Sequence, residues 1–241
     1  MKKLFALLLA MAMVFALAAC GNTEPTTAPT TQPTNPAEPS VMTYEEFMAA
    51  EIDADVVVEC YVQGHQAWWE DKITVYAQDE NGGYYLYEMA CSEEDSARLV
   101  PGTKIRVTGV KAEWAGEIEI VDATFEILEG SWIAEAQDVT ALLGTEELEA
   151  KMNQLGAFKG LTVVSWAYQN ETVGKDIYLT VSYNGAEYDF CVESYLTADG
   201  SEVYDLAETL VAGQTIDIEG FIYWYEGANP HITSITVVEV G

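Results

Sequence analysis

Five aromatic side chains carry the most informative chemistry in this sequence. They are the adjacent pairs Trp68-Trp69 and Trp224-Tyr225 and the single residue Trp114. Flat rings stack on nucleobases and on the faces of sugars, and a stacked base contributes about 1–3 kcal/mol to binding. Large rings also plug the ends of small β-barrels, where they act only as core residues. We take these five aromatics as the candidate ligand-binding residues and keep the plug as the competing interpretation.

The sequence lacks the residue patterns of a catalytic site. Its two histidines, His65 and His231, are far apart, and neither accompanies a motif for a Ser or Cys nucleophile. Carboxylates are so numerous that a close pair would arise from density alone, so it would not indicate glycoside hydrolysis. We therefore expect a non-enzymatic protein with no cofactor and no catalytic residue. A cell-envelope hydrolase is the weaker alternative.

A metal site is not expected either. Asp79-Glu80-Asn81-Gly82 is similar to part of a calcium loop but lacks the spacing and the terminal Glu of that loop. Asn-Gly is instead the strongest signal for a tight hairpin, and Asn184-Gly185 repeats it later in the chain. The pattern favours two hairpins.

The N-terminus carries an export signal and a candidate lipidation site. Lys2 and Lys3 give the N-terminus a positive charge, and residues 4–19 are apolar and uncharged, as in a secretory signal. Leu17-Ala18-Ala19-Cys20-Gly21 resembles the lipobox of bacterial lipoproteins. That resemblance implies removal of residues 1–19, lipidation (palmitate) of Cys20 and anchoring at the extracytoplasmic face of the bacterial cell membrane. An ordinary signal peptide cut after Ala19 is the alternative.

A tether follows the signal. Residues 21–40 contain five of the seven prolines and six threonines, and they include no large apolar side chain. Such a segment cannot bury a core and favours extended polyproline II geometry. We therefore interpret residues 20–40 as a lipidated Cys followed by a flexible Pro/Thr linker.

The rest of the chain is an internal duplication. Residues 99–116 align with residues 210–227, and six of these eighteen positions are identical. The period of about 111 residues matches one small domain rather than a solenoid repeat. We place the two copies at residues 41–130 and 131–241.

Alternation of apolar and polar residues predicts five strands in each copy. A short helix is expected after the third strand, at residues 92–95 and 204–210, and capping threonines predict leading helices after Thr43 and Thr145. The predicted strands are 54–65, 72–79, 84–90, 103–112 and 117–127, and then 160–168, 175–183, 186–193, 214–223 and 231–239.

Five strands with a helix between the third and fourth are the order of the OB-fold, a five-stranded Greek-key barrel. The fold class is therefore all-β with short helices, as two tandem OB-fold barrels. Gly109 and Gly220 are expected where a barrel bends a strand sharply. The aromatic candidates then fall in the loops between strands one and two and between strands four and five, which flank the groove where OB-folds bind oligonucleotides and oligosaccharides.

Three cysteines follow the tether. The duplication places Ser165 and Ser194 at the positions of Cys60 and Cys91, which suggests that these two positions form a pair. A Cys60–Cys91 disulfide is one option outside the cell, and two buried free thiols are the other. Cys191 has no partner in its own copy.

Several motifs together resemble a group of exported lipoproteins from Gram-positive anaerobes. They are Trp68-Trp69, residues 89–94 (Met-Ala-Cys-Ser-Glu-Glu), residues 100–105 (Val-Pro-Gly-Thr-Lys-Ile) and residues 220–227 (Gly-Phe-Ile-Tyr-Trp-Tyr-Glu-Gly). The resemblance covers residues 41–241 and implies tandem OB-folds behind a Pro/Thr linker. It implies no catalytic residue and no ligand.

Charge separates the remaining ligand classes. The chain has ten Lys and Arg against forty Asp and Glu, and each copy has a net charge of −15. Phosphate binding depends on Lys and Arg, so this composition makes nucleic acid an unexpected partner. We therefore expect an acidic binding module whose aromatic loops take a glycan or a protein ligand. An OB-fold that binds oligonucleotides is the alternative.

Overall fold

The computed structural model describes residues 40–198 and 200–238, which belong to one compact unit, Glu38–Gly241. The predicted signal peptide, Cys20 and almost all of the linker lie outside the described residues. No helix within the described ranges has the length and apolar character needed to cross a membrane.

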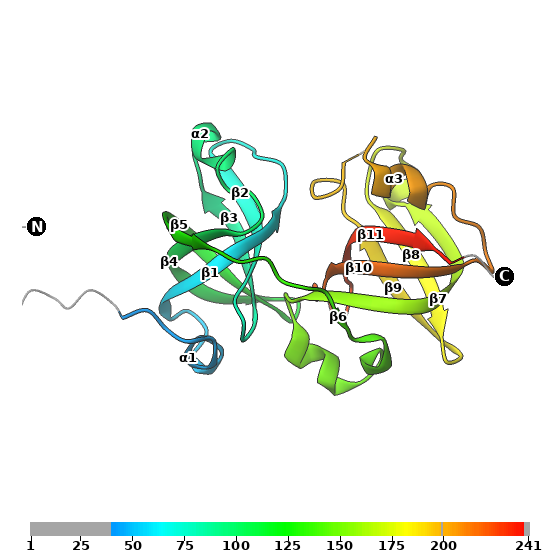
Figure 1. Ribbon diagram of the computed structural model, residues 1–241, viewed down its shortest axis with the longest axis horizontal. Helices are drawn as coiled ribbons and strands as arrows, with labels where there is room; N and C mark the ends of the chain where they lie inside the picture. The colour runs from blue at the N-terminus through cyan, green and yellow to red at the C-terminus, as the bar shows by residue number, and fades with distance from the viewer. Residues whose placement is uncertain (1–39, 199, 239–241) are drawn as a thin grey trace, which may run out of the picture. The chain divides into compact units, whose positions relative to one another are not determined.

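The first copy is a closed five-stranded barrel (Figure 1). Its strands pair in the order β1-β2-β3-β5-β4, and β4 returns to β1 to close the ring. This is the strand order of an OB-fold, so the all-β prediction with short helices is confirmed for this copy. The strands are β1 (Asp55–His65), β2 (Lys72–Gln78), β3 (Gly83–Ala90), β4 (Thr103–Trp114) and β5 (Glu117–Ser131).

Alternation builds the core of this barrel. Inward positions such as Val58, Ile105 and Val107 are fully buried and belong to one apolar cluster. Helix α1 (Tyr44–Ala49) packs Phe47 into the same cluster. The predicted capping box is present, because Thr43 and Glu46 exchange side-chain and backbone hydrogen bonds.

The second copy has the same pattern of pairing. Strand β7 pairs with β8 and with β10, so hydrogen bonds run around a ring in the order β7-β8-β9-β11-β10. A two-residue strand, β6 (Gln137–Asp138), adds to β7 in parallel and was not predicted. The other strands are β7 (Leu155–Tyr168), β8 (Ile177–Tyr183), β9 (Ala186–Val192), β10 (Thr215–Phe221) and β11 (His231–Val237). We call the two copies the first ring and the second ring.

Both predicted helices after the third strands are present, but the second begins and ends earlier than the predicted range of 204–210. Helix α2 (Glu93–Ser96) begins after Ser92, whose hydroxyl accepts a hydrogen bond from the Asp95 amide. Helix α3 (Glu202–Ala207) begins after Ser201 in the same way. The serine hydroxyls at these positions satisfy amides that a short helix leaves unpaired.

The leading helix of the second copy differs from the prediction. Residues Glu146–Lys151 form a 3₁₀ helix, and Thr145 does not cap it. The Thr145 hydroxyl instead donates to the Leu142 carbonyl, which ends the preceding 3₁₀ turn Thr140–Leu142. A third 3₁₀ turn, Gln169–Glu171, joins β7 to β8.

The two Asn-Gly turns also differ from each other. Asn184 and Gly185 both have positive φ and join β8 directly to β9, which is the predicted two-residue hairpin. The first copy has a four-residue loop, 79–82, in which the Asp79 carboxylate accepts hydrogen bonds from the amides of Asn81 and Gly82. An Asx turn therefore replaces the two-residue turn in the first copy.

Gly109 and Gly220 lie at register shifts in their strands, as predicted. A Cβ on Gly109 would lie 2.8 Å from the Val121 carbonyl oxygen, and one on Gly220 would overlap the His231 carbonyl. Only glycine allows the neighbouring backbone to approach so closely at these bends.

The two rings share a third apolar cluster. It joins Tyr76 and Tyr85 of the first ring to Phe221 and Tyr223 of the second. Tyr76 stacks on Phe221 with ring centroids 4.4 Å apart. We call these four residues the joint. The two rings therefore pack against each other through these four side chains, and strand β5 of the first ring continues to Ser131, one residue past the predicted boundary at 130/131.

Candidate binding groove

An open groove of about 520 Å³ lies on the outer face of β2 and β3 in the first ring. Its floor is formed by side chains of those strands, and one wall is the loop that carries Trp68 and Trp69. Tyr195, which follows β9 of the second ring, also lines the groove, and its carbonyl accepts a hydrogen bond from the Ala67 amide of that loop. The lining residues are Gln66, Ala67, Trp68, Trp69, Lys72, Ile73, Thr74, Tyr87, Glu88 and Tyr195.

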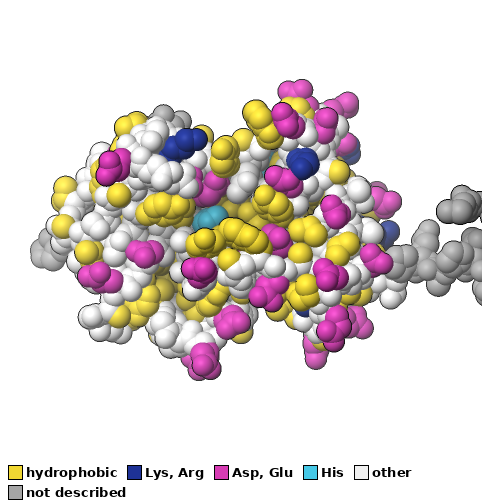
Figure 2. Space-filling view, turned by 180° about the vertical axis from the view of Figure 1, so that it is seen from behind, with side chains coloured by type: hydrophobic (Ala, Val, Ile, Leu, Met, Phe, Trp, Pro, Cys, Tyr) yellow, Lys and Arg dark blue, Asp and Glu magenta, His cyan; other side chains and the backbone are white. Residues whose placement is uncertain are grey.

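Three large rings along the groove are open to solvent. The exposed fractions are 71% for Trp69, 61% for Tyr195 and 42% for Tyr87. In Figure 2, hydrophobic side chains gather in the middle of the face shown, acidic side chains are scattered over it, and Lys and Arg are few. Exposed rings around one hollow are suited to stacking on a planar ligand.

Trp68 and Trp69 have different roles although they are adjacent. Trp68 is half-buried, packs against the core of the first ring, and donates its indole N–H to the Cys91 carbonyl at 2.9 Å. Trp69 points away from that core and is largely exposed. The plug interpretation therefore fits Trp68, and the platform interpretation fits Trp69.

The other three candidate aromatics lie at a different place. Trp114 ends β4, and its ring is 5.1 Å from that of Tyr225, the residue at the equivalent position of the second copy. Trp224 packs its indole over Gly116. None of the three lines the groove, so the structure does not bring the five candidates together.

Tyr87 and Tyr195 were not among the site residues predicted from the sequence. Alternation along β3 contained a signal for Tyr87, because Leu86 points inward and Tyr85 and Tyr87 must therefore point outward. Tyr195 reaches the groove only through contact between the rings, and a single sequence has no signal for that contact.

The floor of the groove is polar but electrically balanced. Lys72 Nζ forms an ion pair with Glu88 Oε2 at 2.6 Å, and this bond raises the pKa of the lysine. The Glu88 amide donates to the Thr74 hydroxyl, and the φ of Glu88 is +44° beside a register shift in β2 and β3. A ligand in the groove thus meets one cation that is already paired.

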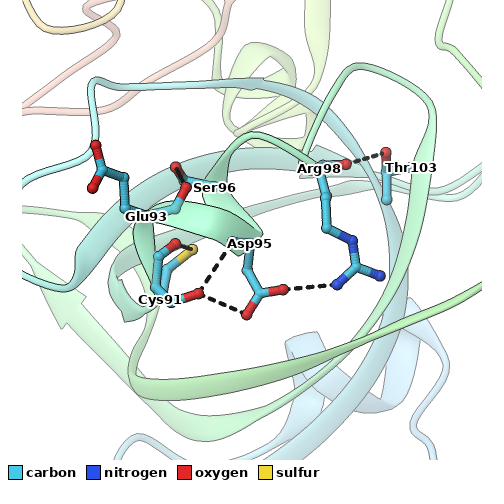
Figure 3. Close-up of polar contacts among 7 residues, drawn as sticks. Cys91, Glu93, Asp95, Ser96, Arg98 and Thr103 are labelled. Carbon is cyan, nitrogen blue, oxygen red and sulfur yellow. Dashed lines mark hydrogen bonds and ion pairs between the residues drawn. The ribbon is translucent and has the colours of Figure 1, made fainter.

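A second hollow of the first ring lies beside α2, and Figure 3 shows the polar contacts among the residues there. The Asp95 carboxylate accepts hydrogen bonds from the Ser92 hydroxyl and from Arg98 Nη1, which lies 2.8 Å away. Cys91 donates its thiol to the Ser92 carbonyl. These groups complete a helix cap, and their partners are one another.

The described cysteines are free and buried. The structure has no Cys60–Cys91 disulfide and matches the alternative of two buried thiols. Burial raises the pKa of Cys60 far above its ordinary value and that of Cys91 to about 11, so neither thiol is activated as a nucleophile. Within residues 40–198 and 200–238, no group of three or more His, Cys, Asp or Glu side chains could hold a metal ion.

Buried ionisable groups concentrate where the rings meet. Glu117 is fully buried and accepts hydrogen bonds from Asn153 Nδ2 at 2.6 Å and from the Trp224 amide at 2.8 Å. Burial raises its pKa to about 8, although these hydrogen bonds act in the opposite direction. Burial also raises the pKa of Glu193 to about 7 and lowers that of His231 to about 3. These groups hold the two rings together through polar contacts.

Comparison with known proteins gives structural neighbours only. No family model matches the chain, and no curated protein matches it. Similar solved structures include the tetrameric p202 HIN2 (12% identity, 78% of this chain and 96% of that chain, TM-score 0.34). A murine DNA-binding protein bound to double-stranded DNA is also similar (9% identity, 77% and 96%, TM-score 0.36). A replication protein A heterotrimer bound to single-stranded DNA is similar over 76% of this chain and 48% of that chain (11% identity, TM-score 0.31).

The expectation that nucleic acid is an unlikely partner is contradicted by these neighbours. Two of them are complexes with DNA, one with double-stranded and one with single-stranded DNA. The physical reason lies in what net charge measures. It limits the contribution of phosphate contacts, but it says nothing about bases that stack on exposed rings.

Proposed function

We propose that this protein is a non-enzymatic binding module whose groove holds single-stranded oligonucleotides by stacking their bases. The observation that carries the proposal is the grouping of Trp69, Tyr87 and Tyr195 around one open groove on the β2–β3 face. That face and the loop between strands one and two are the surfaces on which OB-folds bind oligonucleotides and oligosaccharides.

The energetics of this mode come from the rings rather than from phosphate contacts. Each base stacked on an aromatic ring contributes about 1–3 kcal/mol. The single Lys of the groove is paired with Glu88, and the protein as a whole is strongly acidic. We therefore expect modest affinity and a weak dependence on salt, since few counterions are released on binding.

An oligosaccharide is the second candidate, and the balanced floor of the groove favours it. A neutral sugar meets no charge repulsion from the acidic surface. The Lys72–Glu88 pair and the Thr74 side chain offer donors and acceptors for sugar hydroxyls beside the exposed rings. Sugar faces stack on the same rings without any need for cations.

Tryptophan fluorescence titration tests both candidates. Twelve-residue oligothymidylate, oligoadenylate and neutral chitooligosaccharides are titrated into the full chain at 50 and 200 mM salt. Saturable quenching by the oligonucleotides that changes less than threefold between the salts supports the proposal. Quenching by the sugars alone would replace the ligand class with oligosaccharide. No response to any of the probes would contradict a stacking groove.

We also propose that the module is held at the extracytoplasmic face of the cell membrane by a lipid on Cys20. The charged start, apolar core and small residues before Cys20 support this part of the proposal. Stable anchoring requires two acyl chains, since one chain gives a binding constant of only about 10⁴ M⁻¹. Labelled palmitate should enter the wild-type protein and not Cys20→Ser. Equal incorporation in both would overturn the anchor.

A further inference from the structure

The groove is built from both rings. Trp69 and Tyr87 belong to the first ring, whereas Tyr195 follows the third strand of the second ring. The amide of Ala67 donates a hydrogen bond to the Tyr195 carbonyl at 2.8 Å, which fastens the Trp loop to the turn of the other ring. Any ligand that contacts the aromatic side chains of Trp69, Tyr87 and Tyr195 therefore contacts both copies.

A buried carboxylate shapes the turn that presents Tyr195. Glu193 is 7% exposed, and its two oxygens accept hydrogen bonds from the amides of Tyr195 at 3.1 Å and Leu196 at 2.8 Å. Its backbone carbonyl accepts further hydrogen bonds from the Leu196 and Thr197 amides. The turn is thus wrapped around one side chain.

The same carboxylate is linked to the first ring. The Gln66 side chain, which lines the groove, lies close enough to Glu193 to lower the pKa of that carboxyl, against the larger effect of burial. Leu196 packs against the joint, with its Cδ1 facing Gly64 of β1. One end of the turn is therefore packed into the joint while Tyr195 remains open to solvent.

We propose that the groove is a composite binding site formed by residues of both copies, an inference that rests on the proposed function of the groove. In this site Tyr195 is a specificity-determining wall and Glu193 is the residue that positions it. Ligand bound against Trp69 and Tyr195 stabilises the contact between the two copies, because it adds a second bridge beside the hydrogen bond from the Ala67 amide to the Tyr195 carbonyl. The duplication then creates a binding site that neither copy could form alone.

Hydrogen exchange at the Ala67 amide tests the positioning role without any ligand. In the full chain, Glu193→Ala should speed this exchange at least tenfold, because the turn that carries the Tyr195 carbonyl loses its support. Glu193→Gln keeps one acceptor oxygen and should give an intermediate rate. Glu187→Gln, an exposed change on β9, is the matched control and should leave the rate unchanged.

Unchanged Ala67 exchange in either Glu193 variant would overturn the positioning role. If Glu193→Ala does not fold, Glu193→Gln decides the question. The composite wall is tested separately with Tyr195→Ala, whose side chain is exposed and should leave the melting temperature unchanged.

Oligothymidylate of twelve residues is the probe for the wall. Tyr195→Ala should weaken its binding about tenfold, in line with the loss of one stacked base. Tyr178→Ala removes another exposed tyrosine of the second ring that does not line the groove, and it should leave affinity within twofold. Wild-type affinity in Tyr195→Ala would overturn the composite site and leave the proposed function standing. Failure of the wild type to bind would contradict the proposed function, while the exchange of Ala67 would still decide the role of Glu193.

Discussion

The phenol oxygen of Tyr76 and Nδ1 of His231 lie 2.5 Å apart in the buried joint, although 155 positions separate the two residues in the sequence. Burial lowers the pKa of His231 to about 3, so its ring is neutral and Nδ1 can accept a hydrogen bond from the Tyr76 hydroxyl. Tyr223 stacks on the histidine ring, with the two ring centroids 4.2 Å apart. The two copies are therefore joined by a satisfied polar pair inside an apolar cluster.

We expect Tyr76→Phe to destabilise the protein by about 1–3 kcal/mol, because a buried histidine nitrogen would lose its hydrogen-bond partner. Urea denaturation at pH 7 measures the loss. Tyr87→Phe is the control, since its exposed ring should leave the free energy of unfolding nearly unchanged. Equal stability of Tyr76→Phe and wild type would show that the pair is not intact in solution.

The approach of the rings also depends on Gly83. A Cβ at this position would overlap the backbone carbonyl group of Asn153, which precedes β7. Gly83→Ala should therefore force the backbones apart and destabilise the protein by about 1–3 kcal/mol, as overpacking does elsewhere.

Gly160→Ala is the matched control for Gly83→Ala. Its new Cβ meets nothing within 4 Å, but the φ of +64° should still cost about 1 kcal/mol from backbone strain. Differential scanning calorimetry compares the two variants. A smaller loss for Gly83→Ala than for Gly160→Ala would contradict the close contact between the rings.

Strand positions and their bends are the part of this fold that the sequence predicts well. Strict alternation around Ile105 and Ile216, together with Gly109 and Gly220, is a local property of the chain and needs no knowledge of distant contacts. The type of each turn is harder to predict from the sequence. In the first copy the Asp79 carboxylate accepts hydrogen bonds from the amides of Asn81 and Gly82, and this contact replaces the predicted two-residue turn.

The candidate site was only partly predictable for a related reason. Trp68 and Trp69 are identical in type and adjacent in sequence, so only the packing of the core shows which one is buried. Trp114 and Tyr225 occupy equivalent positions of the two copies and contact each other instead of the ligand groove. Such contacts depend on how the copies dock, and the alternation within each copy does not determine that.

Trp68 and Trp69 should separate stability from binding. Trp68→Ala should lower the free energy of unfolding by about 2–4 kcal/mol, because it removes core packing and the hydrogen bond to the Cys91 carbonyl. Trp69→Ala should change stability by less than about 0.5 kcal/mol, as exposed substitutions do. Thermal melts of both variants measure this difference. A large loss of stability in Trp69→Ala would favour the plug for both residues.

The stability of the folded protein should depend on pH through Glu117, which is buried where the two rings meet. Its pKa is about 8 in the folded protein and near the ordinary value of 4.5 in the unfolded chain. Between about pH 4.5 and pH 8, Glu117 is therefore protonated in the folded state and ionised in the unfolded state. The free energy of unfolding should therefore fall as pH rises from 5.5 to 8.5, by up to about 1.4 kcal/mol per pH unit from this group.

Urea denaturation of Glu117→Gln across the same pH range checks the assignment. The slope should become shallower. Below pH 7 the slope that remains should combine two opposing effects: stability falls with rising pH through Glu193, whose pKa is about 7, and rises through His231, whose pKa of about 3 leaves its proton only on the unfolded chain. Glu113→Gln, an exposed change in β4, should keep the wild-type slope. An unchanged slope in Glu117→Gln would mean that this carboxyl is not the group that titrates.

The most direct test of the binding groove is the indole N–H spectrum of the six tryptophans. Twelve-residue oligothymidylate is added to the ¹⁵N-labelled full chain, with each signal assigned by single Trp→Phe substitution. The signal of Trp69 should shift most and saturate, and that of Trp68, which shares its loop, should follow more weakly. Signals of Trp114 and Trp224 should remain in place. Saturable shifts confined to Trp114 and Trp224, or no shift at any tryptophan, would contradict the account.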